Sequence, residues 1–189
     1  MVSEVGILTS AYLFGAIPTS YLVARYLDGS DMRRFGSGNV GASNLATLLG
    51  TRVGLSVGIF DSLVKGSLPI VLASTLNLNL GIQALIGIAV IVGHNWSPYL
   101  KFTGGRGVAP ASGVIIAQAL WWEVTVELSI GIVGKLVCKD TALLTFIGIL
   151  ILPLMNIALG RPQEIVYMTL GMVAVLMLKR LTANWEHPV

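Results

Sequence analysis

The sequence predicts an all-α integral membrane bundle of about seven transmembrane helices, with the N-terminus outside and the C-terminus cytoplasmic. Hydrophobic residues make up 54% of the 189 residues and charged residues only 11%, and the mean hydropathy is +0.82. A soluble domain needs more charge than this to cover its surface. The cations also gather on one side of the predicted topology, as the positive-inside rule requires. We therefore expect one membrane-embedded domain over residues 1–189.

The spans follow from apolar runs, because a helix crosses the bilayer with about 20 residues. They are expected at 5–24, 53–76, 81–97, 107–122, 124–138, 141–159 and 165–178. Pro18 lies inside the first span and is predicted to kink it. Asn77 and Asn79 mark an outer turn after the second span. The fourth and fifth spans are short, and Glu123 is taken as the boundary between them.

The positions of the lysines and arginines support this topology and argue against a nucleic-acid-binding function. The cytoplasmic side receives Arg25, Arg33, Arg34, Arg52, Lys101, Arg106, Lys135, Lys139, Lys179 and Arg180, whereas only Arg161 is clearly opposite. A wrong number of spans would scatter these cations. No basic run is long enough for a nucleic-acid arm, so we expect no nucleic-acid partner. The two histidines and the single Cys138 lie far apart, so we expect no metal site and no intrachain disulfide.

Two polar segments interrupt the apolar sequence on the predicted cytoplasmic side. The first is Gly36-Ser37-Gly38-Asn39-Val40-Gly41-Ala42-Ser43-Asn44, where glycines alternate with small hydroxyl and amide side chains. Such a segment offers hydrogen-bond donors and acceptors without bulk and suits a small polar ligand. The alternative is an ordinary turn, since these residues dominate turns. The composition favours a site.

The second segment runs from Gly93 to Ala109 and holds His94, Lys101 and the glycine cluster Gly104-Gly105-Arg106-Gly107. Glycines allow positive φ and close approach of a ligand to the amides. Successive amides form an anion-binding nest, and a helix beginning at Val108 adds its positive end. The segment predicts a phosphate or carboxylate site, and the alternative is a glycine-rich turn at the membrane edge.

Asp61 and Lys65 lie four residues apart within the second span, on one helix face. Charges inside a membrane usually face the bundle and pair with each other. The spacing favours an internal ion pair over a catalytic pair, at a position near the inner surface that could support the site.

With these motifs in order along the chain, the sequence resembles the bacterial acyl-phosphate:glycerol-3-phosphate acyltransferases (the PlsY type). Residues 36–44 and 93–109 carry the resemblance, with smaller matches at 15–18, at Phe60-Asp61 and at Arg180-Leu181 with Glu186. The resemblance implies seven spans and a site facing the cytoplasm, in the inner or plasma membrane. It implies transfer of an acyl group from acyl-phosphate to the 1-hydroxyl of glycerol-3-phosphate, giving lysophosphatidic acid and phosphate for phospholipid synthesis.

The resemblance also implies roles for particular residues. Ser37 and His94 are the expected catalytic residues, with His94 either accepting the hydroxyl proton or, as we favour, orienting a reaction in which the leaving phosphate is the base. Substrate and phosphate binding is expected at Gly38, Asn39, Gly41, Ser43, Asn44, Lys101, Gly104, Gly105, Arg106, Gly107, Arg180 and Glu186. No cofactor is expected. The expected partners are the two substrates, membrane lipid and functional coupling to an acyl-phosphate-forming enzyme.

Four positions depart from the family pattern and mark a divergent member. Thr47 stands where an arginine is usual, and Arg106 replaces the lysine of GGKG. Met177 and Asn184 replace an asparagine and a glycine near the end of the chain. Loss of the arginine at 47 removes an expected phosphate ligand. The alternatives are therefore a membrane acyltransferase with another acceptor, or a non-catalytic or transporter-like homologue.

Overall fold

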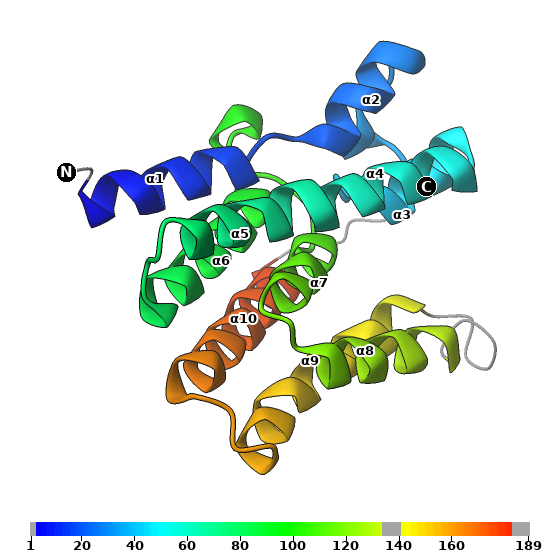
Figure 1. Ribbon diagram of the computed structural model, residues 1–189. Helices are drawn as coiled ribbons and strands as arrows, with labels where there is room; N and C mark the ends of the chain where they lie inside the picture. Colours follow the sequence, from blue (N-terminus) through cyan, green and yellow to red (C-terminus); the bar gives the residue numbers. More distant parts are fainter. Residues whose placement is uncertain (1–2, 134–140, 183–189) are drawn as a thin grey trace.

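The computed structural model describes residues 3–133 and 141–182, and within them the chain is all-α. The helices are α1 (Glu4–Gly15), α2 (Thr19–Leu27), α3 (Ala42–Leu49), α4 (Thr51–Phe60), α5 (Leu68–Thr75), α6 (Leu80–Asn95), α7 (Val108–Ala117), α8 (Trp121–Val133), α9 (Thr141–Ala158) and α10 (Gln163–Thr182), shown in Figure 1. The predictions that concern Lys135, Cys138, Lys139, Asn184 and Glu186 fall outside the described residues.

Three helical segments in the described ranges are long and apolar enough to cross a membrane: Glu4–Leu27, Thr51–Thr75 and Gln163–Thr182. The other apolar helices are shorter, at Leu80–Asn95, Val108–Ala117 and Ile147–Ala158. The predicted spans 53–76, 81–97, 141–159 and 165–178 each correspond to a helix or a continuous helical rod. An all-α apolar bundle is therefore confirmed.

The first predicted span, 5–24, is two helices rather than one kinked helix. α1 ends at Gly15 and α2 begins at Thr19, with Pro18 as its N-cap residue. Proline has no N–H to donate to the preceding turn and its ring disfavours helix in the residue before it. Figure 1 shows α1 and α2 joined by an extended connection and running in different directions. The break exposes the carbonyl of Ile17 for a contact described below.

The second span is one rod, in which α4 and α5 are joined by a π-helical stretch, Asp61–Ser67 (Figure 1). α7 lies directly against this stretch, and two glycines allow the contact. A Cβ at Gly66 would lie 2.3 Å from the carbonyl oxygen of Pro110, and one at Gly113 would lie 1.9 Å from that of Ser62. Ser67 also donates a hydrogen bond of 2.7 Å to the carbonyl of Gly113. α7 thus holds the π-helical stretch in place.

The boundary expected at Glu123 is wrong. α7 ends at Ala117, a turn follows in which Ala119 has a φ of 53°, and α8 begins at Trp121. Glu123 lies in the first turn of α8, where a carboxylate is favoured by the helix dipole. With 10 residues, α7 is also too short to span a hydrocarbon core of about 30 Å. Composition alone did not reveal the break because residues 118–120 include no proline or glycine.

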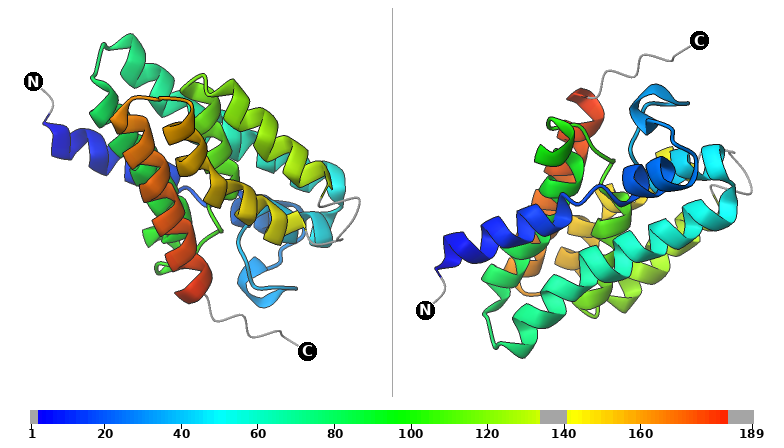
Figure 2. Two further views of the ribbon diagram at one scale, coloured as in Figure 1. Left: turned by 90° about the horizontal axis from the view of Figure 1, so that it is seen from below. Right: turned by 90° about the horizontal axis from the view of Figure 1, so that it is seen from above.

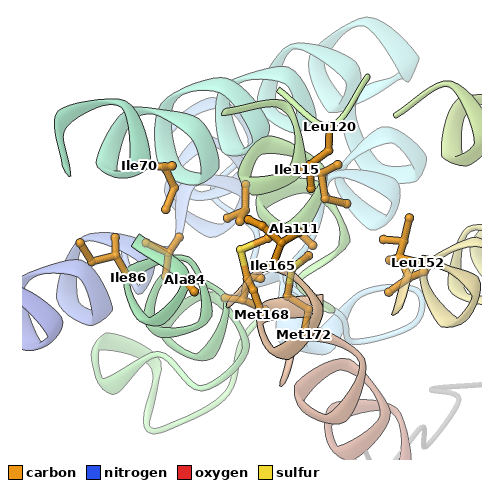
Figure 3. Packing of buried hydrophobic residues seen from close by; sticks show 14 of the residues in the cluster. Ile70, Ala84, Ile86, Ala111, Ile115, Leu120, Leu152, Ile165, Met168 and Met172 are labelled. Carbon is orange, nitrogen blue, oxygen red and sulfur yellow. The ribbon is translucent and has the colours of Figure 1, made fainter. Parts of the chain in front are cut away.

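The core lies where α5, α6, α7, α9 and α10 meet (Figure 3). Met168 and Met172 of α10 are fully buried beside Ala111 and Ile115 of α7. The two views in Figure 2 show α1 crossing α6 and α10 lying beside α9, in agreement with the contacts. The crossing of α1 and α6 is close because a Cβ at Gly93 would lie 2.0 Å from the carbonyl of Tyr12. The core therefore surrounds the C-terminal end of α6, which carries His94.

Candidate active site

A cavity of about 230 Å³ lies where the two polar segments meet the rod formed by α4 and α5. It is lined by Asn39, Gly41, Ala42, Ser43, Asp61, His94, Arg106, Gly107, Val108 and Ala109. Three stretches far apart in the sequence, 39–43, 61 and 94–109, are thus brought together. The volume suits a small polar molecule, being below the roughly 300–1,000 Å³ of pockets for larger ligands.

Two helices begin at this cavity. α3 starts after Gly41 and α7 after Gly107, and no side chain caps either helix. The first amides of a helix have no partner within the helix and point along the dipole, so such an end attracts anions. Gly107 has a φ of 78°, which suits glycine. The predicted helix start at Val108 is confirmed, whereas the start of α3 at this site was not predicted.

Asn44 holds the first segment in shape. Its side-chain nitrogen donates to the carbonyls of Phe35 at 2.9 Å and Asn39 at 3.0 Å, and its oxygen accepts from the amide of Ser37 at 3.4 Å. The side chain is buried and does not line the cavity. Asn44 thereby shapes the loop that presents Asn39 and Gly41.

His94 sits at the end of α6 against the second glycine cluster. The amide of Gly105 donates a hydrogen bond of 3.0 Å to the carbonyl of His94. A Cβ at Gly105 would lie 2.1 Å from His94 Nε2, so any other residue there would displace the ring. Gly104 is constrained in the same way by the His94 carbonyl, 2.3 Å from its would-be Cβ. The glycines that were predicted to bind phosphate also make room for the imidazole.

The end of α6 is held from two sides. Tyr12 of α1 donates to the carbonyl of Trp96 at 2.8 Å, and Ser97 donates to the carbonyl of Ala16 at 2.6 Å. From α10, the buried ammonium of Lys179 donates to the carbonyl of Asn95 at 2.6 Å and lies 5.3 Å from the Trp96 ring centroid. A cation at a helix C-terminus is favoured by the dipole. These contacts fix the direction in which His94 enters the cavity.

The predicted ion pair of Asp61 and Lys65 is confirmed. Lys65 Nζ lies 2.7 Å from Asp61 Oδ1, and both side chains are about 1–2% exposed. Thr19 donates to the same carboxylate oxygen at 2.9 Å. Lys65 also donates to the carbonyl of Ile17 at 2.6 Å, which the break before α2 leaves available. Sequence reasoning missed that Asp61 lines the cavity beside His94.

Positive charge at the cavity comes from Arg106, which lines it, and from the two helix starts. Arg33, in contrast, is engaged elsewhere. Its guanidinium hydrogen-bonds to Asp31 at 2.6 Å and lowers the pKa of that carboxyl to about 2. Arg33 also lies 5.4 Å from the ring centroid of Tyr21. The Asp31–Arg33 pair thus belongs to the loop after α2 and not to the cavity.

The predicted site residues divide into two groups. Those that line the cavity are Asn39, Gly41, Ser43, His94, Arg106 and Gly107. Those that do not are Ser37, Gly38, Asn44, Lys101, Gly104, Gly105 and Arg180. Ser37 is half-buried two residues before Asn39, and Lys101 is exposed on a left-handed turn with a φ of 55°. Glu186 lies outside the described residues.

The chain is similar to known proteins over nearly its whole length. A family model described as glycerol-3-phosphate acyltransferase matches residues 5–188. Glycerol-3-phosphate acyltransferase 5 of Dehalococcoides mccartyi is 38% identical over 95% of this chain and 80% of its own length. Glycerol-3-phosphate acyltransferase 2 of Moorella thermoacetica is 39% identical over 95% of this chain and 94% of its own length. The crystal structure of PlsY (YgiH), an integral membrane glycerol 3-phosphate acyltransferase in its glycerol 3-phosphate form, matches with a TM-score of 0.85 and 27% identity, covering 94% of this chain and 88% of that chain.

Proposed function

The chain belongs to the glycerol-3-phosphate acyltransferase family, and from this premise we propose how its cavity performs the reaction. The fatty acyl group of acyl-phosphate is transferred to the 1-hydroxyl of glycerol-3-phosphate. The products are lysophosphatidic acid and inorganic phosphate. The protein is thus a membrane acyltransferase of phospholipid synthesis.

One observation carries the proposal: two uncapped helix starts and Arg106 converge on a single cavity of about 230 Å³ beside His94. Both substrates carry a phosphate, and a phosphate only accepts hydrogen bonds, so each needs donors. The start of α3 and the start of α7 provide backbone donors on two sides of the cavity. Such an arrangement can hold two anions near one reacting centre.

The main task of the protein in this reaction is to align the two substrates. Acyl-phosphate is a mixed anhydride and is already activated. The 1-hydroxyl oxygen of the acceptor attacks the acyl carbonyl carbon, the bond from that carbon to the phosphate oxygen breaks, and the hydroxyl proton passes to the departing phosphate. His94, which lines the cavity, orients the reacting groups. Alignment and preorganised donors then provide the rate enhancement.

The expected orientation places the cavity on the cytoplasmic face of the inner or plasma membrane, with the N-terminus outside. Arg25, Arg33 and Arg52 are exposed on the segments flanking the first polar loop, at this end of the bundle. Trp121 and Trp122 are exposed at the start of α8, where the opposite membrane interface is expected. Cations on the cytoplasmic side and aromatic residues at the interfaces are typical of membrane proteins.

A different acceptor is the second candidate, and Thr47 favours it. Thr47 lies on α3 one turn after Ser43, a cavity residue, and its hydroxyl donates to the Ser43 carbonyl at 3.3 Å. The family's usual arginine at this position would reach the same end of the cavity with a positive charge. An acceptor with less negative charge would lose less binding affinity when this arginine is absent.

The test is phosphate release by the purified protein in lipid nanodiscs given palmitoyl-phosphate, with and without glycerol-3-phosphate. Acceptor-dependent release together with lysophosphatidic acid is the expected result. Phosphate release at the same rate with and without glycerol-3-phosphate would contradict the proposal. So would the absence of phosphate release by folded protein.

Variants then test the site. His94→Ala, at a residue that lines the cavity, and Ser37→Ala, at the residue that the family resemblance makes catalytic, are each expected to lower kcat/KM by at least about 10²-fold while the protein remains folded and extractable. Ser56→Ala is the matched control, because Ser56 is exposed on α4 and its hydroxyl donates only to the Arg52 carbonyl, at 3.0 Å. Normal turnover in both site variants would contradict the residue assignment.

A further inference from the structure

The cavity holds two kinds of polar group, and the proposed mechanism uses only one of them. The helix starts and Arg106 donate hydrogen bonds, as a phosphate needs. Asp61 and the side-chain oxygen of Asn39 can only accept them. Asn39 is 5% exposed, and its Oδ1 has no hydrogen-bond partner among the described residues. Acceptors facing a ligand require a donor on that ligand.

Asp61 is the stronger acceptor, and its two oxygens are used unequally. Within the described residues, the contacts from Lys65 and from Thr19 both end on Oδ1, at 2.7 and 2.9 Å. The residue also lines the cavity, and among the described residues no contact to Oδ2 is assigned. A carboxylate kept only for structural reasons would be expected to have both oxygens bonded to the protein, since unsatisfied buried acceptors are costly.

The structure around Asp61 restricts the movement of its carboxylate. It begins the π-helical stretch Asp61–Ser67, a type of helix distortion that is frequent at functional sites. The close backbone contacts at Gly66 and Gly113 prevent the stretch from shifting against α7. The ion pair with Lys65 fixes the position of the carboxylate, so it suits a hydroxyl that is bound but does not react.

We propose that Asp61 binds the 2-hydroxyl of glycerol-3-phosphate through Oδ2 and so selects an acceptor with a secondary hydroxyl. This rests on the proposed function of the same cavity. The secondary hydroxyl donates to the carboxyl group of Asp61, while the 1-hydroxyl stays beside His94 and the phosphate lies at the helix starts. Binding at three points also fixes which terminal hydroxyl faces the acyl donor.

The test compares glycerol-3-phosphate with 3-hydroxypropyl phosphate, which has the phosphate and the reacting hydroxyl but lacks the secondary hydroxyl. With palmitoyl-phosphate as donor, the unmodified protein is expected to favour glycerol-3-phosphate in kcat/KM by about 10- to 100-fold, the value of one hydrogen bond to a charged group. In Asp61→Leu combined with Lys65→Met, the ratio of kcat/KM for glycerol-3-phosphate to kcat/KM for 3-hydroxypropyl phosphate should fall to about 1–3. This double change removes the ion pair as a unit, which buried pairs tolerate better than loss of one charge.

Thr19→Val is the matched control. It removes a hydrogen bond to Oδ1 of the same carboxylate but leaves Oδ2, so the acceptor ratio should stay at the unmodified value. A milder variant, Asp61→Asn, keeps a polar side chain of the same shape and should lower the ratio partially. A structural role alone would lower turnover of both acceptors together and leave their ratio unchanged.

A second measurement needs no turnover. The two acceptors are compared for how far each raises the thermal unfolding midpoint, since a ligand stabilises the folded state according to its affinity. Glycerol-3-phosphate should give the larger shift in the unmodified protein, and the two acceptors should give equal shifts in Asp61→Leu combined with Lys65→Met. The inference is overturned if the unmodified protein acylates both acceptors with nearly equal kcat/KM. It is also overturned if the double variant keeps the same difference between the acceptors in kcat/KM or in the shift of the unfolding midpoint. Failure of the unmodified protein to acylate either acceptor overturns the proposed function instead.

Discussion

In the part of the chain that the structure describes, two buried carboxylates are paired with cations, and they differ in how their oxygens are used. Glu123 is fully buried and both its oxygens accept from Arg161, Nε at 2.9 Å and Nη2 at 3.0 Å. Asp61 directs its described contacts through one oxygen and lines a cavity. The first pair joins α8 to the turn between α9 and α10, and the second lies between the two glycine-rich segments.

The difference separates a structural clamp from a binding site. A forked guanidinium satisfies a carboxylate completely, so nothing remains at Glu123 for a ligand. At the cavity, two helix starts have no side-chain cap, glycines leave space, and the described contacts of Asp61 all end on one of its oxygens. Changes at the cavity should therefore affect activity, and changes at the clamp should affect stability.

Among the changes that contrast the cavity with the clamp, the largest effect on activity is expected from Gly105→Ala. The added methyl group would lie 2.1 Å from His94 Nε2 and must turn the ring away, and a displacement of this size costs about 10²-fold in kcat/KM. Gly148→Ala is the control, because the atom nearest to its methyl group would be in the Ile130 side chain at 3.5 Å, an ordinary contact. Acylation rates and thermal melting of both variants measure the effect. Full activity in Gly105→Ala would show that the position of His94 does not matter.

The clamp should show the reverse behaviour, with an asymmetry between its partners. Arg161→Ala leaves a fully buried carboxylate unpaired and should destabilise the protein by about 3 kcal/mol. Glu123→Ala leaves only Arg161, whose side chain is 28% exposed, and should cost about 1 kcal/mol. The measurement is the order of thermal unfolding midpoints, with kcat/KM for acylation unchanged in both. Equal midpoints would contradict the described burial.

The smallest effect is expected from Thr47→Arg, which restores the charge that the family usually has. Position 47 lies one turn after Ser43, so a guanidinium there would approach the start of α3. The KM for glycerol-3-phosphate should fall about threefold to tenfold, and less at high salt. Thr47→Gln adds similar length without charge and should leave KM unchanged. Equal effects from both variants would attribute the change to side-chain size.

Much of the site was visible in the sequence because short-range chemistry decided it. The glycines around Arg106, the helix start at Val108 and the ion pair of Asp61 with Lys65 are each local patterns, and the structure confirms the last two directly. Asn44 shows the limit of such reasoning. It was predicted as a binding residue by type, yet its amide is used by the carbonyls of its own loop. Composition does not distinguish these uses, since both need the same donors and acceptors.

By itself, the sequence determined that this protein is an apolar helical bundle whose polar chemistry is confined to a few segments, because burial of backbone groups in apolar surroundings requires helices and makes isolated charges costly. Only the tertiary structure decided that residues 39–43, Asp61 and residues 94–109 share one cavity. It also decided that the chain breaks before Thr19 and at 118–120. The shared cavity depends on contacts between distant segments, such as the contact of α7 with the π-helical stretch. These contacts involve backbone atoms, which a sequence pattern does not identify.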